Sequence, residues 1–185
     1  MLAELRRHVP ATVITVQACF EDLQLEQTYG LVYAAAALHW TRPEGRWSRV
    51  AALLEPDGVL ASFGGPVHLG DPDVEEAVRA ARAPWMETDD VASPDGTPLD
   101  HRMQWPGTEL EQSEWFTDVQ QSIIERRLTM TARGYVGQLS TVSAYLVLPA
   151  SQQAQVYARI AQVLPERVDV TADITVHLAR RHPEP

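Results

Sequence analysis

The feature that most constrains the fold is an alternation of short apolar runs with a helical pattern. Residues 31–36 form an apolar run that begins as a strand, and residues 59–63 form a second such run. Between them, apolar side chains recur at the spacing of one helix face, at Trp47, Val50, Ala51 and Leu54. Residues 55–58, Glu-Pro-Asp-Gly, supply a stop and a turn. Strand, helix and strand in this order predict a βαβ unit with two neighbouring parallel strands.

Further strands and helices are predicted on both sides of this unit. The expected strands are 13–18, 119–128 and 168–179, and the expected helices are 2–9, 43–54, 71–82, 131–139 and 152–164. Thr131 is a plausible N-cap, and the alternation over 168–179 is typical of an edge or antiparallel strand. The fold class is therefore α/β, a Rossmann-like, mainly parallel sheet with helices on both faces. Its 185 residues fit one domain, 1–185.

Residues 84–113 interrupt the periodic pattern and form a variable insert. From Pro84 to Gly107, prolines, glycines and acidic residues replace the repeating apolar positions. A segment of this length is usually a lid, a binding loop or a mobile segment. Trp85 and Trp105 could cover an apolar ligand, or they could anchor the insert to the core, and the sequence leaves both interpretations open.

The composition limits the kinds of partner and the cellular compartment that we expect for this protein. A formal net charge of −10 disfavours nucleic acid, because affinity for DNA or RNA depends on Lys and Arg neutralising phosphates. No apolar run reaches the length of a membrane span. A single cysteine, Cys19, cannot form an internal disulfide, which favours a reducing cytoplasm. The six histidines are scattered without ligand spacing, so no metal site is expected.

One stretch carries a specific resemblance. Residues 29–40 end in Leu38-His39-Trp40 and are followed by the helix and the turn that lead into 59–63. This stretch resembles the fourth and fifth strands of class I S-adenosylmethionine-dependent methyltransferases, in the small-molecule, type 11-like branch. Residues 16–23 are similar to the third strand of that family and its acidic loop, and 135–145 and 178–181 also match.

The resemblance implies a function and a set of site residues. It implies methyl transfer from S-adenosylmethionine to a small-molecule acceptor. The cofactor positions fall on Cys19, Phe20, Ala34, Ala35 and Ala36, where a thiol at Cys19 is a poor substitute for the carboxylate that the family commonly uses. His39 is the candidate base, because an imidazole titrates near neutrality, although packing is the commoner role. The expected substrate contacts are His39, Trp40, Trp85 and Trp105.

The resemblance begins after the glycine-rich cofactor loop of the family. In strand order 3-2-1-4-5-7-6, strands one and two have no counterpart here, so we expect a truncated sheet whose fourth strand either presents an unpaired edge or pairs with the third strand in a new way. Such an edge favours a homo-oligomer. We also expect S-adenosylmethionine to bind this chain weakly or not at all.

Two other functions remain open at this point. The chain could be a non-catalytic remnant of the methyltransferase fold that acts as a partner or scaffold protein. A nicotinamide-dependent dehydrogenase shares the fold class, but the glycine fingerprint is missing and the run His39-Trp40 argues against it.

Overall fold

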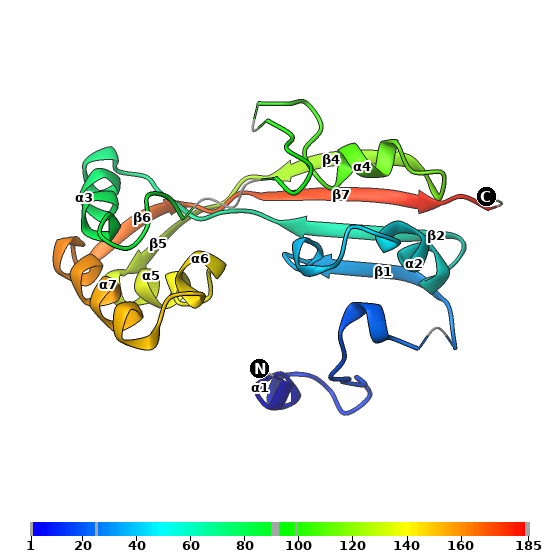
Figure 1. Ribbon diagram of the computed structural model, residues 1–185, viewed down its shortest axis with the longest axis horizontal. Coiled ribbons are helices and arrows are strands. Elements are labelled where there is room, and N and C mark those ends of the chain that lie inside the picture. The colour runs from blue at the N-terminus through cyan, green and yellow to red at the C-terminus, as the bar shows by residue number, and fades with distance from the viewer. Residues whose placement is uncertain (1, 25, 90–92, 99, 184–185) are drawn as a thin grey trace.

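The structure, a computed structural model, describes residues 2–24, 26–89, 93–98 and 100–183. A four-stranded sheet spans one half of the molecule (Figure 1). Its strands are β1 (Tyr29–Ala35), β2 (Leu54–Gly64), β7 (Ile174–Arg181) and β4 (Phe116–Ile124), in the order β1-β2-β7-β4. β1 and β2 are parallel, whereas β7 is antiparallel to both β2 and β4. The predicted pair of neighbouring parallel strands is confirmed.

Helix α2 (Arg46–Leu53) connects β1 to β2, as the apolar spacing predicts. Its buried residues Val50 and Ala51 pack against Leu60 of β2 and Ala179 of β7 in one apolar cluster. Leu110 of the short helix α4 (Gly107–Glu111) joins the same cluster, so α2 and α4 lie on one face of the sheet. The opposite face carries exposed apolar side chains.

A second sheet occupies the other half of the molecule. Its strands are β3 (His68–Leu69), β6 (Arg167–Thr171) and β5 (Arg127–Thr131), all antiparallel. Four helices lie around this sheet: α3 (Pro72–Arg82), α5 (Ala132–Leu139), α6 (Ser143–Leu146) and α7 (Ala150–Val163). The expected helices are confirmed, and Thr131 caps α5 by accepting a hydrogen bond from the Gly134 amide at 3.1 Å.

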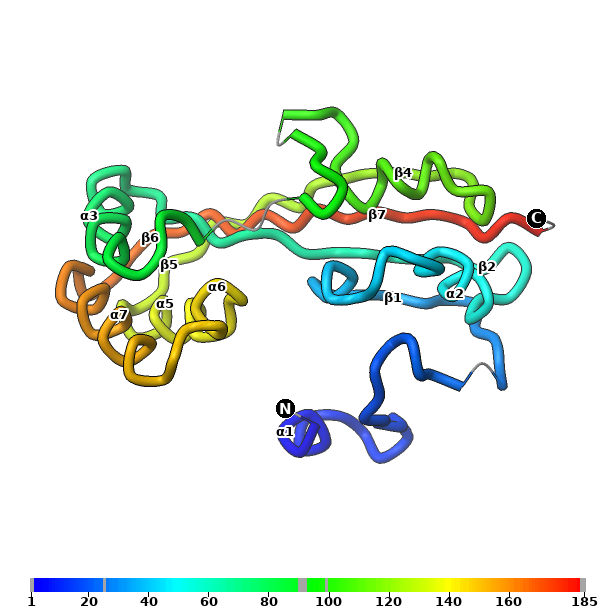
Figure 2. Tube along the Cα trace, in the orientation of Figure 1, coloured from blue at the N-terminus to red at the C-terminus, as the bar shows by residue number. Residues whose placement is uncertain are grey.

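The strands expected at 119–128 and 168–179 are each divided between the two sheets. The chain passes from β4 to β5 and from β6 to β7 beside the segment that leaves β2 (Figure 2). Asp173 holds this junction, because its Oδ1 accepts hydrogen bonds from the Arg126 amide at 2.9 Å and from Arg127 Nη1 at 2.7 Å. The expectation of two continuous strands was wrong. The hydrogen-bonded ladder of each strand is interrupted at this junction, where Asp173 contacts Arg126 and Arg127.

The strand expected at 13–18 is also absent from the described residues. After α1 (Leu2–His8) the chain runs without a ladder to the short 3-10 helix η1 (Phe20–Asp22), and Val13, Ile14 and Val16 are exposed. A β-branched run becomes a strand only where a neighbouring strand pairs with it. Neither side of this segment has such a neighbour among the residues that the structure describes.

The insert 84–113 attaches to both halves of the molecule. Trp85 and Met86 pack against the cluster around the second sheet. Met103 is buried, and Gln104 donates its amide hydrogen to Gln121 Oε1 of β4 at 2.6 Å. Residues 90–92 and 99 of this predicted insert lie outside the described residues. In the described part of the chain, no helix has the length and apolar character needed to cross a membrane.

Candidate functional site

The carboxyl ends of β1 and β2 approach each other closely. The Ala36 amide donates to the Phe63 carbonyl at 2.8 Å, and Ala36 has a φ of 46°. A Cβ atom on Gly64 would lie 3.2 Å from the Cβ of Ala36. Small residues are therefore required at this place, where Ala34 is half-buried and Ala35 and Ala36 are exposed.

A short turn after β1 carries His39 and Trp40. Leu38 anchors this 3-10 helix, η2 (Leu38–Trp40), by its burial, and Thr41 Oγ1 closes it by donating to the Leu38 carbonyl at 2.7 Å. The rings of His39 and Trp40 lie 5.3 Å apart between centroids, tilted by 38°. His39 is half-buried, whereas 65% of Trp40 is exposed. The Trp40 ring is thus open to solvent beside the His39 imidazole.

Burial lowers the pKa of His39 below its usual value of 6.5. Partial loss of water disfavours the charged imidazolium. The imidazole is therefore neutral at pH 7, which is the form that can accept a proton.

The loop that carries Cys19 and Phe20 is tied to the region after this turn. The Arg42 amide donates to Glu21 Oε1 at 2.8 Å, and this hydrogen bond is the main reason that the pKa of Glu21 is lowered. Arg49 of α2 donates from Nε to the Phe20 carbonyl at 2.8 Å and places its guanidinium 5.8 Å from the Phe20 ring centroid. The thiol of Cys19 is exposed.

Trp85 and Trp105 do not come together. Arg159 of α7 lies over the Trp85 ring at 5.6 Å, in the half that holds the second sheet. The Trp105 ring instead faces the Arg46 guanidinium at 5.3 Å, beside α2. The two tryptophans expected to contact a substrate therefore lie in different halves of the molecule and against different arginines.

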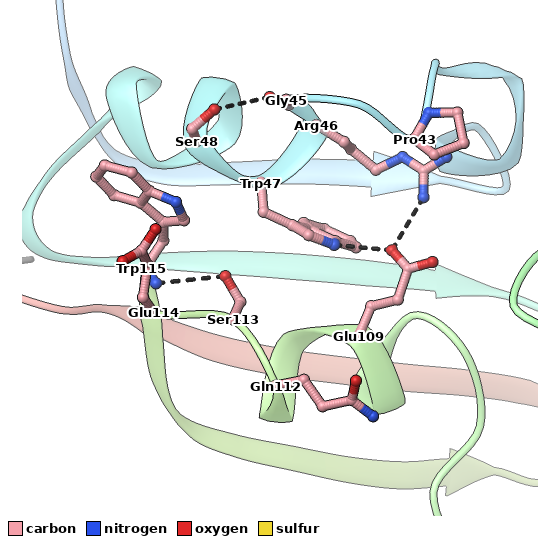
Figure 3. A pocket seen from close by; sticks show the side chains of 10 residues that line it. All are labelled: Pro43, Gly45, Arg46, Trp47, Ser48, Glu109, Gln112, Ser113, Glu114 and Trp115. Atoms are coloured by element: carbon pink, nitrogen blue, oxygen red, sulfur yellow. Dashed lines mark hydrogen bonds and ion pairs between the residues drawn. The ribbon is translucent and has the colours of Figure 1, made fainter.

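A cleft of about 500 Å³ runs between α2 and α4 (Figure 3). It is lined by ten residues, Pro43, Gly45, Arg46, Trp47, Ser48, Glu109, Gln112, Ser113, Glu114 and Trp115. In Figure 3 the Arg46 guanidinium and the Trp47 indole both point at the Glu109 carboxylate. The distances to Oε2 are 3.2 Å from Arg46 Nη1 and 2.8 Å from Trp47 Nε1.

Arg46 is unusual because only 2% of it is exposed. Besides Glu109, it donates from Nε to Thr41 Oγ1 at 2.7 Å and from Nη2 to the Thr41 carbonyl at 2.8 Å. Neither Arg46 nor Glu109 was predicted from the sequence, where they stand 63 positions apart. The only local sign of this pair is an arginine next to a tryptophan at the start of a helix. That pattern does not indicate which distant carboxylate the arginine contacts. Because its hydrogen-bond donors already bind Thr41 and Glu109, we assign Arg46 a structural role beside the site.

The described residues hold no cluster of three or more His, Cys, Asp or Glu side chains able to bind a metal ion.

Comparisons with known proteins match several solved structures, one of which serves as a point of reference. No protein-family model and no curated protein sequence matches this chain. A structure described as "a Putative Type II Methyltransferase from Anaeromyxobacter dehalogenans" aligns over 98% of this chain and 78% of its own, with a TM-score of 0.55 and 22% identity. At this level of identity, the comparison shows that the two chains share a fold, the mixed α/β architecture described above, and nothing more.

Proposed function

We propose that this chain transfers a methyl group from S-adenosylmethionine to a small molecule at the carboxyl ends of β1 and β2. One observation carries the proposal: β1 and β2 are parallel and end side by side, at small residues next to the turn with His39 and Trp40. In open α/β sheets, ligands bind outside the carboxyl ends of the strands. The fold shared with the methyltransferase structure supports the same chemistry.

The residues present fit the methyl donor at the strand ends. The strand ends carry only small residues, Gly64 and Ala36 among them, which lets a ligand approach the backbone, and Ala34, Ala35 and Ala36 would hold the aminoacyl part there. The Phe20 ring and the backbone beside Cys19 would hold the base, with Arg49 fixing the position of Phe20. When bound, S-adenosylmethionine supplies an electrophilic methyl group.

His39 and Trp40 would serve the acceptor. The exposed Trp40 ring offers an apolar wall, and the neutral His39 imidazole accepts a proton if the acceptor must lose one. The protein otherwise orients the two molecules and excludes water. Since Trp85 and Trp105 pack elsewhere, the proposal for the acceptor rests on His39 and Trp40. The exposed thiol of Cys19 suits a reducing compartment, and we propose the cytoplasm.

The test combines calorimetric titration with a radiolabelled methyl-transfer assay. S-adenosylmethionine is titrated into the intact chain up to millimolar concentration, and transfer is measured to a panel of small aromatic acceptors. We expect weak but saturable binding that Phe20→Ala weakens further. We expect His39→Gln to leave binding unchanged and to reduce the rate by about 10²-fold or more, the usual contribution of a general base.

The pH profile separates a base from a packing residue. Because His39 must be neutral to accept a proton and its pKa is lowered, the rate should hold at neutral pH and fall only as the pH drops through that lowered value. His39→Gln should remove this decline, and His8→Gln on the exposed helix α1 is the matched control. No saturable binding at any concentration would contradict the proposal and favour a non-catalytic partner protein.

A further inference from the structure

The turn that carries His39 and Trp40 is closed by a chain of hydrogen bonds with a single possible direction. Arg46 Nε lies 2.7 Å from Thr41 Oγ1, which in turn lies 2.7 Å from the Leu38 carbonyl. A guanidinium can only donate, so the Thr41 hydroxyl accepts from Arg46 and gives its own hydrogen to Leu38. Bonds in such a chain polarise one another, and the charged donor at its start makes the first bond a strong one.

The same guanidinium binds the end of the turn a second time. Arg46 Nη2 donates to the Thr41 carbonyl at 2.8 Å, and the Thr41 amide donates to the Leu38 carbonyl at 3.0 Å. Both the side chain and the backbone of Thr41 are therefore held by Arg46. The donors of a guanidinium lie in one rigid plane, so the position of the turn depends on the groups that orient this plane.

The groups that orient Arg46 come from α4 and the residues before it (Figure 3). Glu109 Oε2 accepts from Arg46 Nη1 at 3.2 Å and from Trp47 Nε1 at 2.8 Å, so one carboxylate oxygen binds two neighbouring residues of α2. The centroid of the Trp105 ring lies 5.3 Å from Arg46 Cζ. Glu109 and Trp105 both belong to the insert 84–113, and Arg46 therefore joins the insert to the turn.

The ion pair between Arg46 and Glu109 is largely shielded from water. The two side chains are 1% and 27% exposed, respectively. Such a pair is screened less than a surface pair, and removal of one partner leaves the other charge buried without its counter-ion. Without the carboxylate, only the bonds to Thr41 remain among the hydrogen bonds of Arg46 described above. The guanidinium would then be free to tilt, and the turn would follow it.

We propose that Glu109 is a positioning residue for methyl transfer, which holds the turn with His39 and Trp40 through Arg46 and the Thr41 hydroxyl. This role rests on the proposed function, because it concerns the acceptor side of that site. The insert then controls how firmly the imidazole and the indole are held toward the acceptor. Loss of Glu109 should lower kcat and leave the binding of S-adenosylmethionine unchanged, since the cofactor contacts lie at the strand ends.

Thr41→Val tests the chain of hydrogen bonds without changing any charge. Valine has the shape of threonine but no hydroxyl, so Arg46 Nε and the Leu38 carbonyl both lose a partner. We expect NMR titration to show the pKa of His39 rising toward 6.5, because a loosened turn exposes the imidazole to water. Hydrogen exchange of the Trp40 and Thr41 amides should become about tenfold faster or more. Thr41→Ser keeps the hydroxyl and should retain the wild-type values.

Glu109→Gln tests the link from the insert to the turn. Loss of a carboxylate charge by itself can only lower the pKa of an imidazole. We expect the pKa of His39 to rise instead, which only a loosened turn explains, and exchange of the Thr41 amide to become faster. Glu111→Gln is the matched control, because it removes the same charge from an exposed position on the same helix. It should leave both values unchanged.

These measurements need no methyl acceptor, so they are separate from the methyl-transfer assay. In that assay Thr41→Val and Glu109→Gln should lower kcat by about tenfold or more, with the KM for S-adenosylmethionine unchanged. A wild-type pKa of His39 in both variants, or equal changes in Thr41→Ser and Glu111→Gln, would overturn the link between insert and turn. The expected shifts without transfer to any acceptor would support the link and contradict the proposed function.

Discussion

Gly65 lies where β2 leaves the four-stranded sheet, and a Cβ atom there would overlap the backbone carbonyl of Asp173. Gly137 in α5 is its opposite, because a Cβ atom there meets nothing within 4 Å. At the scale of single residues, the space around the backbone therefore decides the outcome of the same glycine-to-alanine change.

Gly65→Ala should lower the free energy of unfolding by about 1–3 kcal/mol, the usual cost of forcing extra atoms into a packed place. Gly137→Ala should raise it by about 0.5–1 kcal/mol, since alanine restricts the unfolded chain and favours a helix. Urea unfolding followed by circular dichroism measures both values. Equal effects of the two substitutions would contradict the junction described here.

His177 is a buried residue whose protonation should affect stability. It is 3% exposed, and its Nε2 lies 2.9 Å from Gln121 Oε1. Burial lowers the pKa of His177 below its usual value of 6.5. Between the lowered pKa and 6.5, the unfolded chain binds more protons than the folded chain, so the folded state loses stability as the pH falls through this window.

We therefore expect the urea midpoint of the wild-type chain to decrease as the pH is lowered from 7 through 6.5. His177→Gln should lower the midpoint at pH 7 and make its dependence on pH flatter. His8→Gln, which removes an exposed imidazole from α1, is the control and should keep the wild-type slope. An unchanged slope in His177→Gln would show that another group carries the effect.

At the scale of elements, Arg46 joins three parts of the chain. It lies at the start of α2, bonds the turn at Thr41, pairs with Glu109 of α4 and faces Trp105 of the insert. These contacts hold the turn with His39 and Trp40 at a fixed place relative to α2. Removing the guanidinium would leave the Glu109 carboxylate half-buried with Trp47 as its remaining donor.

Arg46→Ala should reduce the free energy of unfolding by about 2 kcal/mol or more, below the cost of breaking a fully buried pair because part of Glu109 reaches solvent. Arg42→Ala, at an exposed position before the same helix, should change it by less than about 0.5 kcal/mol. Tryptophan fluorescence during urea unfolding reports both, since Trp47 and Trp105 border the guanidinium.

At the scale of the whole molecule, two apolar clusters stabilise the two halves. One cluster surrounds Ile160 and Val170 near the second sheet, and the other surrounds Leu60 and Leu110 on the first sheet. The two clusters share no residue among those described. Four passages of the chain connect them, from β2 to β3, from α3 to α4, from β4 to β5 and from β6 to β7.

Ile160→Ala and Leu60→Ala should each cost about 2–5 kcal/mol, as for other buried large residues. Because the clusters are separate, each substitution should speed hydrogen exchange in a different region of the chain. Ile160→Ala should speed exchange of the α3, α5 and α7 amides more than that of β1 and β2, and Leu60→Ala should do the reverse. A uniform increase over the chain in both variants would mean that the halves unfold as one unit.

Local patterns in the sequence determined most of the individual elements. Apolar spacing predicted α2, α3 and α7, the apolar run of 59–63 predicted β2, and Thr131 predicted the start of α5. These features depend on residues within a few positions of one another, where periodicity and capping act. The turn with His39 and Trp40 was found by resemblance, and its role in methyl transfer stays a prediction.

The tertiary structure alone decided how these elements are joined. The break at Asp173 depends on Arg126, 47 positions earlier, and the burial of Arg46 depends on Glu109, 63 positions later. The segment 13–18 has strand-forming residues, but no other described residues pair with it, and Trp85 and Trp105 pack in different halves. A strand or a buried charge needs a partner brought by the fold, and no pattern within a short window of sequence identifies that partner.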